Sequence, residues 1–140
     1  MQKIIIASDH GGFNLKNEII RHLKSNGYDI DDRGCYDTAS CDYPIYAKAV
    51  ANEVSETGIK GILICGTGIG MSIAANKVKN IRASVCSDAY SAKMTRKHND
   101  SNILCLGARV VGEGLAMDIV DTWLNTEFEG GRHQKRIDMI

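Results

Sequence analysis

Short apolar runs alternate with longer amphipathic segments along the whole chain. The run at 3–7 is compact and β-branched, which is typical of a strand buried on both faces of a parallel sheet. The segment at 13–26 places Leu15, Ile19 and Leu23 on one face of a helix. This pattern predicts strands at 3–7, 28–31, 61–64, 83–86 and 103–106. It predicts helices at 13–26, 44–56, 71–78, 89–98 and 113–124.

Several residues mark where these elements begin and end. Gly27 and Gly58 follow predicted helices and suit the left-handed residue that ends a helix, while Pro44 suits a first turn. Five strands alternating with helices predict an α/β fold. We expect a Rossmann-like three-layer α/β/α sandwich, with a five-stranded parallel sheet in the order 2-1-3-4-5. The 140 residues are enough for a single domain (1–140), with a tail from about 126 to 140 that is basic in its middle.

The predicted topology brings two polar turns together. In a sheet of this kind, ligands bind outside the carboxyl ends of the strands, at the point where the strand order reverses. That point lies between the first and third strands. The turns that follow them are Ser8–Gly12 and Cys65–Gly70. The two turns should therefore face each other across one crevice.

The second of these turns carries the strongest chemical signal in the chain. It lies within the sequence GILICGTGIGMSIAANK, where Cys65 ends an apolar run and glycines follow at 66, 68 and 70. Glycines before a helix leave backbone N–H groups uncovered, which suits a phosphate or a developing oxyanion. An electropositive loop also favours the reactive thiolate form of a cysteine. The alternative is that Cys65 is a small core residue at the end of a strand.

The loop differs from two common nucleotide-binding motifs. The pattern GxGxxG would need glycine at position 71, where this chain has Met71. A Walker A loop would need a Lys-Ser or Lys-Thr pair after its last glycine, but here Met71 and Ser72 follow Gly70.

Other polar residues have two interpretations on sequence alone. Asp9 could cap the first helix or contact a ligand together with His10. His98 and Asn99 end a charged helix, which is ordinarily a solvated terminus. The arginines at 109, 132 and 136 are ordinarily surface charges, yet the dense cluster GGRHQKR could bind a phosphate. The cysteines at 86 and 105 fall in or beside strands, and we expect them in the core.

Composition excludes several classes of function. The 17 Lys and Arg residues balance 17 Asp and Glu residues, so no net charge steers the chain to nucleic acid or an anionic membrane. This balance also permits self-association. We expect no membrane span and no secretory signal. The five cysteines are odd in number and never spaced as CxxC, which favours reduced thiols in the cytoplasm and argues against a zinc site.

Taken together, six motifs resemble one known family. They are SDHGG, DYP, ICGTGIGMSIAANK, RKHND, GAR and EGGRHQKR, and they extend over essentially the full length. They are similar to the family of ribose-5-phosphate isomerase B and the galactose-6-phosphate isomerase subunits. The resemblance implies an aldose–ketose isomerase of the non-oxidative pentose phosphate pathway that uses no cofactor and no metal. It also implies a homodimer or a dimer of dimers, with each active site shared between subunits and the C-terminal tail packed on a neighbour.

The resemblance also implies roles for individual residues. Cys65 would be the base that moves a proton between C1 and C2, His98 would open the furanose ring, and the backbone of 66–70 would stabilise the enediolate oxygen. The catalytic residues are then Cys65, His98 and Thr67. The substrate-binding residues are Asp9, His10, Tyr43, Gly66, Thr67, Gly68, Ile69, Gly70, Ser72, Asn99, Arg109, Arg132 and Arg136.

Two alternatives stay open at this point. The substrate could be a six-carbon sugar phosphate, such as allose 6-phosphate or galactose 6-phosphate, or the chain could be a non-catalytic sugar-phosphate sensor. Galactose-6-phosphate isomerase subunits generally lack a histidine at position 98, and one of the two lacks the cysteine. Since Cys65 and His98 are both present, the sequence favours a pentose phosphate and catalysis. Some relatives use a glutamate just after the glycines as the base, but here that position is Met71.

Overall fold

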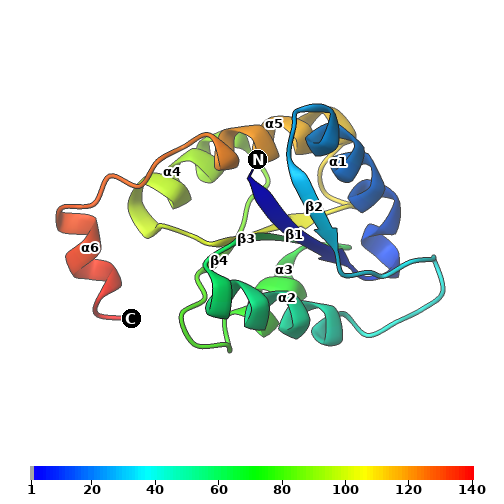
Figure 1. Ribbon diagram of the computed structural model, residues 1–140, viewed down its shortest axis with the longest axis horizontal. Coiled ribbons are helices and arrows are strands. Elements are labelled where there is room, and N and C mark those ends of the chain that lie inside the picture. The colour runs from blue at the N-terminus through cyan, green and yellow to red at the C-terminus, as the bar shows by residue number, and fades with distance from the viewer. Residues whose placement is uncertain (1) are drawn as a thin grey trace.

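A parallel sheet of five strands forms the centre of the computed structural model, which describes residues 2–140 (Figure 1). The strands are β1 (Lys3–Ser8), β2 (Asp29–Asp32), β3 (Lys60–Cys65), β4 (Ala83–Val85) and β5 (Ile103–Gly107). The helices are η1 (His10–Gly12), α1 (Phe13–Ser25), α2 (Tyr43–Thr57), α3 (Ile69–Ala75), α4 (Ala89–Asn99), α5 (Glu113–Leu124) and α6 (Arg132–Ile137). None of the helices described in 2–140 is long and apolar enough to cross a membrane.

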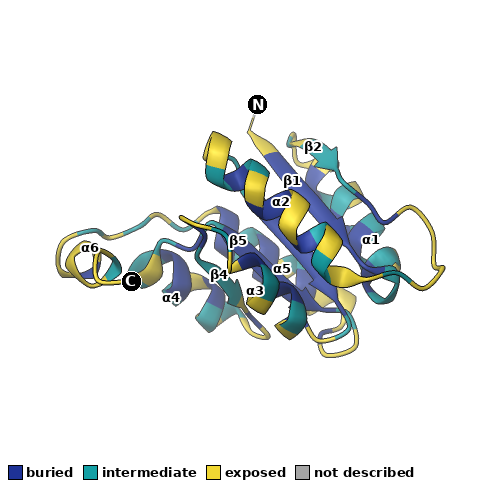
Figure 2. Cartoon of the chain, turned by 90° about the horizontal axis from the view of Figure 1, so that it is seen from below, coloured by how far each residue is buried: buried dark blue, intermediate teal, exposed yellow. Residues whose placement is uncertain are grey.

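Helices cover both faces of the sheet, as the alternating pattern predicts. Ile4 and Ile6 point to one face and pack in a core with α1, α4 and α5, whereas Ile5 points to the other face and packs with α2 and α3. Figure 2 shows β1 buried between these layers and the outer surface of α2 exposed. The three-layer α/β/α class is therefore confirmed.

The expected strand order is wrong at one edge of the sheet. The observed order is β2-β1-β3-β5-β4, so the last two strands exchange places relative to 2-1-3-4-5. Every residue of β5 is buried, and its side chains need cover on both faces, which only a central position gives. Strand β4 has three residues, none of them buried, and a short strand of this kind suits an edge. The exchange leaves β1 beside β3, so the predicted crevice is unaffected.

Several predicted boundaries also shift. Helix α3 starts at Ile69 rather than Met71 and ends at Ala75 rather than Val78, so Gly70 lies in its first turn. The two helix-ending glycines are confirmed, because Gly58 has φ 74° and Gly27 has φ 88°. The pattern of apolar positions did not predict α6, which is a short helix with one buried residue. In Figure 1 this helix lies beyond the end of α4 and outside the layered body.

Candidate active site

The turns after β1 and β3 meet at the carboxyl edge of the sheet, as the sequence predicts. The Asp9 N–H donates a hydrogen bond of 3.1 Å to the carbonyl oxygen of Ile64. A Cβ atom at Gly11 would lie 3.6 Å from the backbone nitrogen of Gly66. The two loops therefore lie side by side at the carboxyl ends of β1 and β3.

Close backbone contacts explain the glycines in and beside these two loops. A Cβ atom at Gly12 would lie 2.6 Å from the Ile64 carbonyl oxygen, and one at Gly107 would lie 2.6 Å from the Thr67 carbonyl oxygen. Gly68 has a φ of 79°, which a side chain disfavours. The loop after Cys65 is therefore held directly against the end of β5. Two further backbone hydrogen bonds fix it there, from Ala108 to the Cys65 carbonyl oxygen and from Arg109 to that of Gly66.

Cys65 ends β3 and points its thiol into this loop. The side chain is 5% exposed, and its Sγ accepts a hydrogen bond of 3.1 Å from the backbone N–H of Gly68. The sequence predicts that two other thiols, Cys86 and Cys105, are structural. Burial raises the pKa of Cys86 to about 11 and raises that of Cys105 still further, which keeps both protonated near neutral pH. Cys86 and Cys105 are thus confirmed as buried residues of the core.

Asp9 and His10 lie in the loop after β1 and have structural partners there. The Oδ1 atom of Asp9 accepts a 3.1 Å hydrogen bond from the Gly12 N–H, so Asp9 caps η1, the short helix that leads into α1, rather than α1 itself. His10 Nδ1 accepts a 3.2 Å hydrogen bond from the Cys41 N–H. A neutral tautomer of His10 with its proton on Nε2 fits this contact, and it leaves an N–H donor free.

Three more of the predicted residues lie around the same loop. The ring of Tyr43 lies against Gly70, where a Cβ atom would come within 2.8 Å of it. The exposed Arg109 reaches the loop after Cys65, because a Cβ atom at Gly66 would lie 3.2 Å from its Nη1. Ser72 donates a 2.7 Å hydrogen bond to the Ile69 carbonyl oxygen. The structure therefore gathers the predicted residues from positions 9 to 72, and Arg109, at one site.

The remaining predicted residues form a second cluster. His98 and Asn99 end α4, and Arg132 and Arg136 lie one turn apart on α6. These four residues line a pocket of about 370 Å³ between the two helices. Both arginines are exposed, as an unbound phosphate-binding pair or a surface pair would be.

Two residues that the sequence interpretation missed belong to this second cluster. The buried His133 stacks on His98 with ring centroids 4.3 Å apart. Glu129 Oε1 lies 3.3 Å from His133 Nε2 and 3.8 Å from His98 Nε2. Burial first, and then the positive charges of His98 and Arg132, lower the pKa of His133. The i,i+4 spacing of Glu129 and His133 was the available signal.

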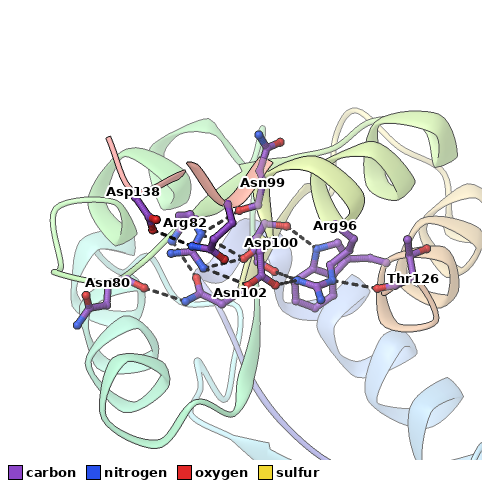
Figure 3. Close-up of polar contacts among 11 residues, drawn as sticks. Asn80, Arg82, Arg96, Asn99, Asp100, Asn102, Thr126 and Asp138 are labelled. Atoms are coloured by element: carbon purple, nitrogen blue, oxygen red, sulfur yellow. Dashed lines mark hydrogen bonds and ion pairs between the residues drawn. The ribbon is translucent and has the colours of Figure 1, made fainter. Parts of the chain in front are cut away.

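A polar network holds the end of α4 in place (Figure 3). The buried Arg96 donates to Asp100 Oδ1 at 2.8 Å, to the Ser101 carbonyl oxygen at 2.7 Å and to that of Thr126 at 3.2 Å. From the start of β4, Arg82 donates to the Asn99 carbonyl oxygen at 2.9 Å. These contacts fix the backbone that carries His98 and Asn99.

The two clusters lie at opposite ends of the strands: the first at the carboxyl ends of β1 and β3, and the second near the amino end of β5. Helix α4 leads from the carboxyl end of β4 to the amino end of β5, where Asn102 accepts a hydrogen bond from Gly61. Gly61 starts the buried part of β3 and Cys65 ends it, four residues or about 13 Å further along. In Figure 1 α6 and the end of α4 lie to the left, while β1 points to the right. One chain therefore does not bring His98 to Cys65.

The fold and the first cluster define a class of protein: a doubly wound α/β protein with a glycine-rich loop and a thiol at the switch point of its sheet. Within that class, the chain belongs to the ribose/galactose isomerase family, whose sequence pattern matches residues 4–140.

Individual relatives cover almost the whole chain. Ribose-5-phosphate isomerase B of Escherichia coli (strain K12) is 52% identical over 141 residues, which cover 100% of this chain and 95% of that protein. A structure of ribose-5-phosphate isomerase B from Clostridium thermocellum is 56% identical with a TM-score of 0.97, and the match covers 99% of this chain and 94% of that one. A third relative, ribose-5-phosphate isomerase B from Mycoplasma genitalium with bound ribulose 5-phosphate, is 45% identical with a TM-score of 0.94. That match covers 98% of this chain and 92% of the other.

Proposed function

We propose that this protein interconverts D-ribose 5-phosphate and D-ribulose 5-phosphate through a cis-enediolate, with Cys65 as the base. The observation that carries the proposal is the thiol of Cys65 at the head of a loop of backbone N–H groups, with the Gly68 N–H 3.1 Å from its sulfur. The family and the ribose-5-phosphate isomerase B relatives support the reaction.

The reaction needs a base and an acceptor for negative charge. A thiolate of Cys65 takes the proton from the carbon next to the carbonyl group and returns it to the neighbouring carbon, which is worth about 10²–10⁴-fold in rate. The carbonyl oxygen becomes negative as the proton leaves, and the N–H groups of 66–70 stabilise it. The proton of the neighbouring hydroxyl group then passes to this oxygen, so that the carbonyl group moves by one carbon. Thr67, Ile69 and Ser72 shape this loop, because Thr67 Oγ1 accepts a 3.2 Å hydrogen bond from the Ile69 N–H.

The sugar and its phosphate bind on either side of this loop. We assign sugar hydroxyl contacts to Asp9, Tyr43 and Asn99. We assign the phosphate to His10 and to three arginines, Arg109, Arg132 and Arg136. Arginine binds phosphate oxygens through two parallel hydrogen bonds, and phosphate binding holds the reacting carbons at the thiol.

The proposed site is completed by a second copy of the chain. The second cluster contains His98, Asn99, Arg132 and Arg136. Since it lies at the opposite end of the strands from Cys65, we place these residues in the site of a neighbouring subunit. There His98 opens the furanose ring as an acid and base. The exposed tail, including α6, packs on the partner in this arrangement, which is a homodimer or a dimer of dimers.

A mixture of two inactive variants tests the shared site. Cys65→Ala and His98→Asn chains are each expected to convert ribose 5-phosphate poorly. After co-expression, about half of the dimers contain one of each chain, and each mixed dimer has one intact site, so about a quarter of the wild-type activity returns. No recovery from well-folded mixed dimers would mean that both residues act within one chain.

Two alternatives are separated by one assay. A preference for allose 6-phosphate over ribose 5-phosphate in kcat/KM would change the substrate to a six-carbon sugar phosphate. Binding of ribulose 5-phosphate without turnover would make the protein a sensor. The presence of both Cys65 and His98 favours the pentose phosphate isomerase.

The compartment and pathway follow from the same proposal. We place the protein in the cytoplasm, in the non-oxidative pentose phosphate pathway. All five cysteines are free, which suits a reducing compartment. We expect no dependence on a metal or cofactor, and unchanged activity after treatment with a chelator checks this.

A further inference from the structure

We propose that His98, Glu129 and His133 bind one divalent transition-metal ion, of the Zn²⁺, Ni²⁺ or Co²⁺ type, and that the bound ion blocks His98. The ion is an exchangeable inhibitor and not a cofactor. The binding depends only on these three side chains. The inhibition rests on the proposed function, because it requires His98 to take part in turnover.

The geometry is close to that of a three-ligand site. The ligand atoms of the three side chains all lie within 4.8 Å of one another. Metal–ligand bonds of about 2.0–2.1 Å at tetrahedral angles separate the ligand atoms by about 3.3–3.4 Å. Glu129 Oε1 and His133 Nε2 already have this separation, at 3.3 Å, whereas His98 Nε2 lies 3.8 Å from the same oxygen.

The side chain that has to move is free to do so. The two imidazole rings are nearly parallel, at 16°, so their nitrogens converge on one ion only when a ring tilts out of the stack. The side chain of His98 is 40% exposed and that of Glu129 is 46% exposed, but that of His133 is only 8% exposed. His133 therefore acts as the fixed ligand, and His98 tilts towards it.

The donor set and surroundings favour a borderline metal. Two imidazole nitrogens and one carboxylate suit zinc and its neighbours better than magnesium or calcium. Three protein ligands leave the fourth position to water, and the adjoining pocket of about 370 Å³ gives access to it. The backbone also fixes the ligands, since the Glu129 N–H donates to the Lys97 carbonyl oxygen at 3.1 Å.

Nearby cations limit the affinity. Lys97 Nζ lies 4.0 Å from Glu129 Oε2, and Arg132 and Arg136 line the same pocket. Their positive charges oppose a divalent cation, so we expect chelators to remove the ion readily. The same arginines are assigned to the substrate phosphate. The phosphate and the metal ion would therefore bind in the same pocket.

Titration with Co²⁺ tests the binding directly, because the visible spectrum of the bound ion depends on the number and type of its ligands. We expect saturation at one ion per chain, and at least a tenfold loss of affinity in Glu129→Gln and in His133→Gln. His22→Gln is the matched control, since His22 pairs with Asp121 at a separate place on the chain. Urea midpoints check that each variant is folded. Equal affinity in His133→Gln and wild type would overturn the site.

Sulfur is the competing ligand that the spectrum must exclude. An intense sulfur-to-cobalt band that disappears in Cys65→Ala would place the ion on the thiol and overturn the proposal. Unchanged Co²⁺ binding in Cys65→Ala supports the histidine site.

Inhibition is measured separately from binding. Zn²⁺ should inhibit conversion of ribose 5-phosphate, and Glu129→Gln should need at least about tenfold more Zn²⁺ for the same fractional inhibition. Full wild-type activity with the site saturated would overturn the blocking of His98. If the protein had no isomerase activity at all, the proposed function would fail while the Co²⁺ result still decided the metal site.

Discussion

Gly107→Ala is expected to displace the reactive loop without removing or adding a polar side chain. Gly107 ends β5, and the loop after Cys65 crosses it at backbone contact distance. A Cβ atom there would lie 2.6 Å from the Thr67 carbonyl oxygen, 2.7 Å from its carbonyl carbon and 2.9 Å from its Cα. These atoms are backbone, so rotation of a side chain cannot relieve the contact.

The size of the effect follows from these distances. Ordinary van der Waals contact begins near 3.4 Å, so Thr67 has to move by about 0.8 Å. Overpacking of this kind costs about 1–3 kcal/mol of folding free energy. A misplacement of about 1 Å at a catalytic site costs about 10²-fold in rate. Such a loss of kcat/KM corresponds to about 2.7 kcal/mol of transition-state stabilisation.

The assay compares kcat/KM for ribose 5-phosphate with the urea midpoint of the same protein. Gly114→Ala is the matched control, because a Cβ atom there meets nothing within 4 Å. Gly114 lies in α5, where alanine is favoured over glycine by up to about 1 kcal/mol. The control should therefore keep full activity and equal or greater stability. Wild-type kinetics in Gly107→Ala would refute the link between the position of the loop and catalysis.

Three further predictions concern the phosphate, ring opening and pH. Arg132→Ala or Arg136→Ala should raise KM more than it lowers kcat, and inorganic phosphate should inhibit these variants less than wild type; unchanged KM in both would make them surface residues. His98→Asn should slow single-turnover conversion of ribose 5-phosphate far more than deuterium exchange at C1 of ribulose 5-phosphate, which needs no ring step; equal losses would contradict the ring-opening role. Burial raises the pKa of Cys86 to about 11, while an unfolded thiol titrates near pH 8.5, so the unfolded chain loses a proton that the folded chain keeps. Stability should therefore fall between about pH 8.5 and 11, and Cys86→Ala should reduce the fall in urea midpoint between pH 7.5 and pH 10; an equal fall in that variant would show that other groups cause it.

Elements of the fold were predictable from the sequence because each is encoded locally. Apolar runs located β1, β3 and β5, and Gly27 and Gly58 marked the ends of two helices. The spacing of apolar residues along a strand does not say which strands lie beside it. The exchange of β4 and β5 was missed for that reason. The clue was length and burial, since β4 has only three residues and β5 is apolar throughout.

The candidate site also has one part that was predictable from the sequence and one part that was not. The meeting of the two loops was predictable because Asp9 follows β1 and Cys65 ends β3, two neighbouring strands of a known topology. The approach of Glu129 and His133 to His98 was not, because it depends on how the chain returns from α5 to the end of α4. Residues so far apart in sequence leave no periodic signal. The same holds for the contact between Gly107 and Thr67, which only the packed backbone reveals.

Deuterium exchange at C1 of ribulose 5-phosphate tests the central claim most directly, because it reports the proton transfer alone. Wild-type protein should incorporate solvent deuterium, and Cys65→Ala should do so at least about 10²-fold more slowly, since a positioned base is worth at least that much. Cys86→Ala, which removes a buried thiol of the core, should exchange at the wild-type rate. Exchange in Cys65→Ala at more than about a tenth of the wild-type rate would contradict the account, because another group would then be the base.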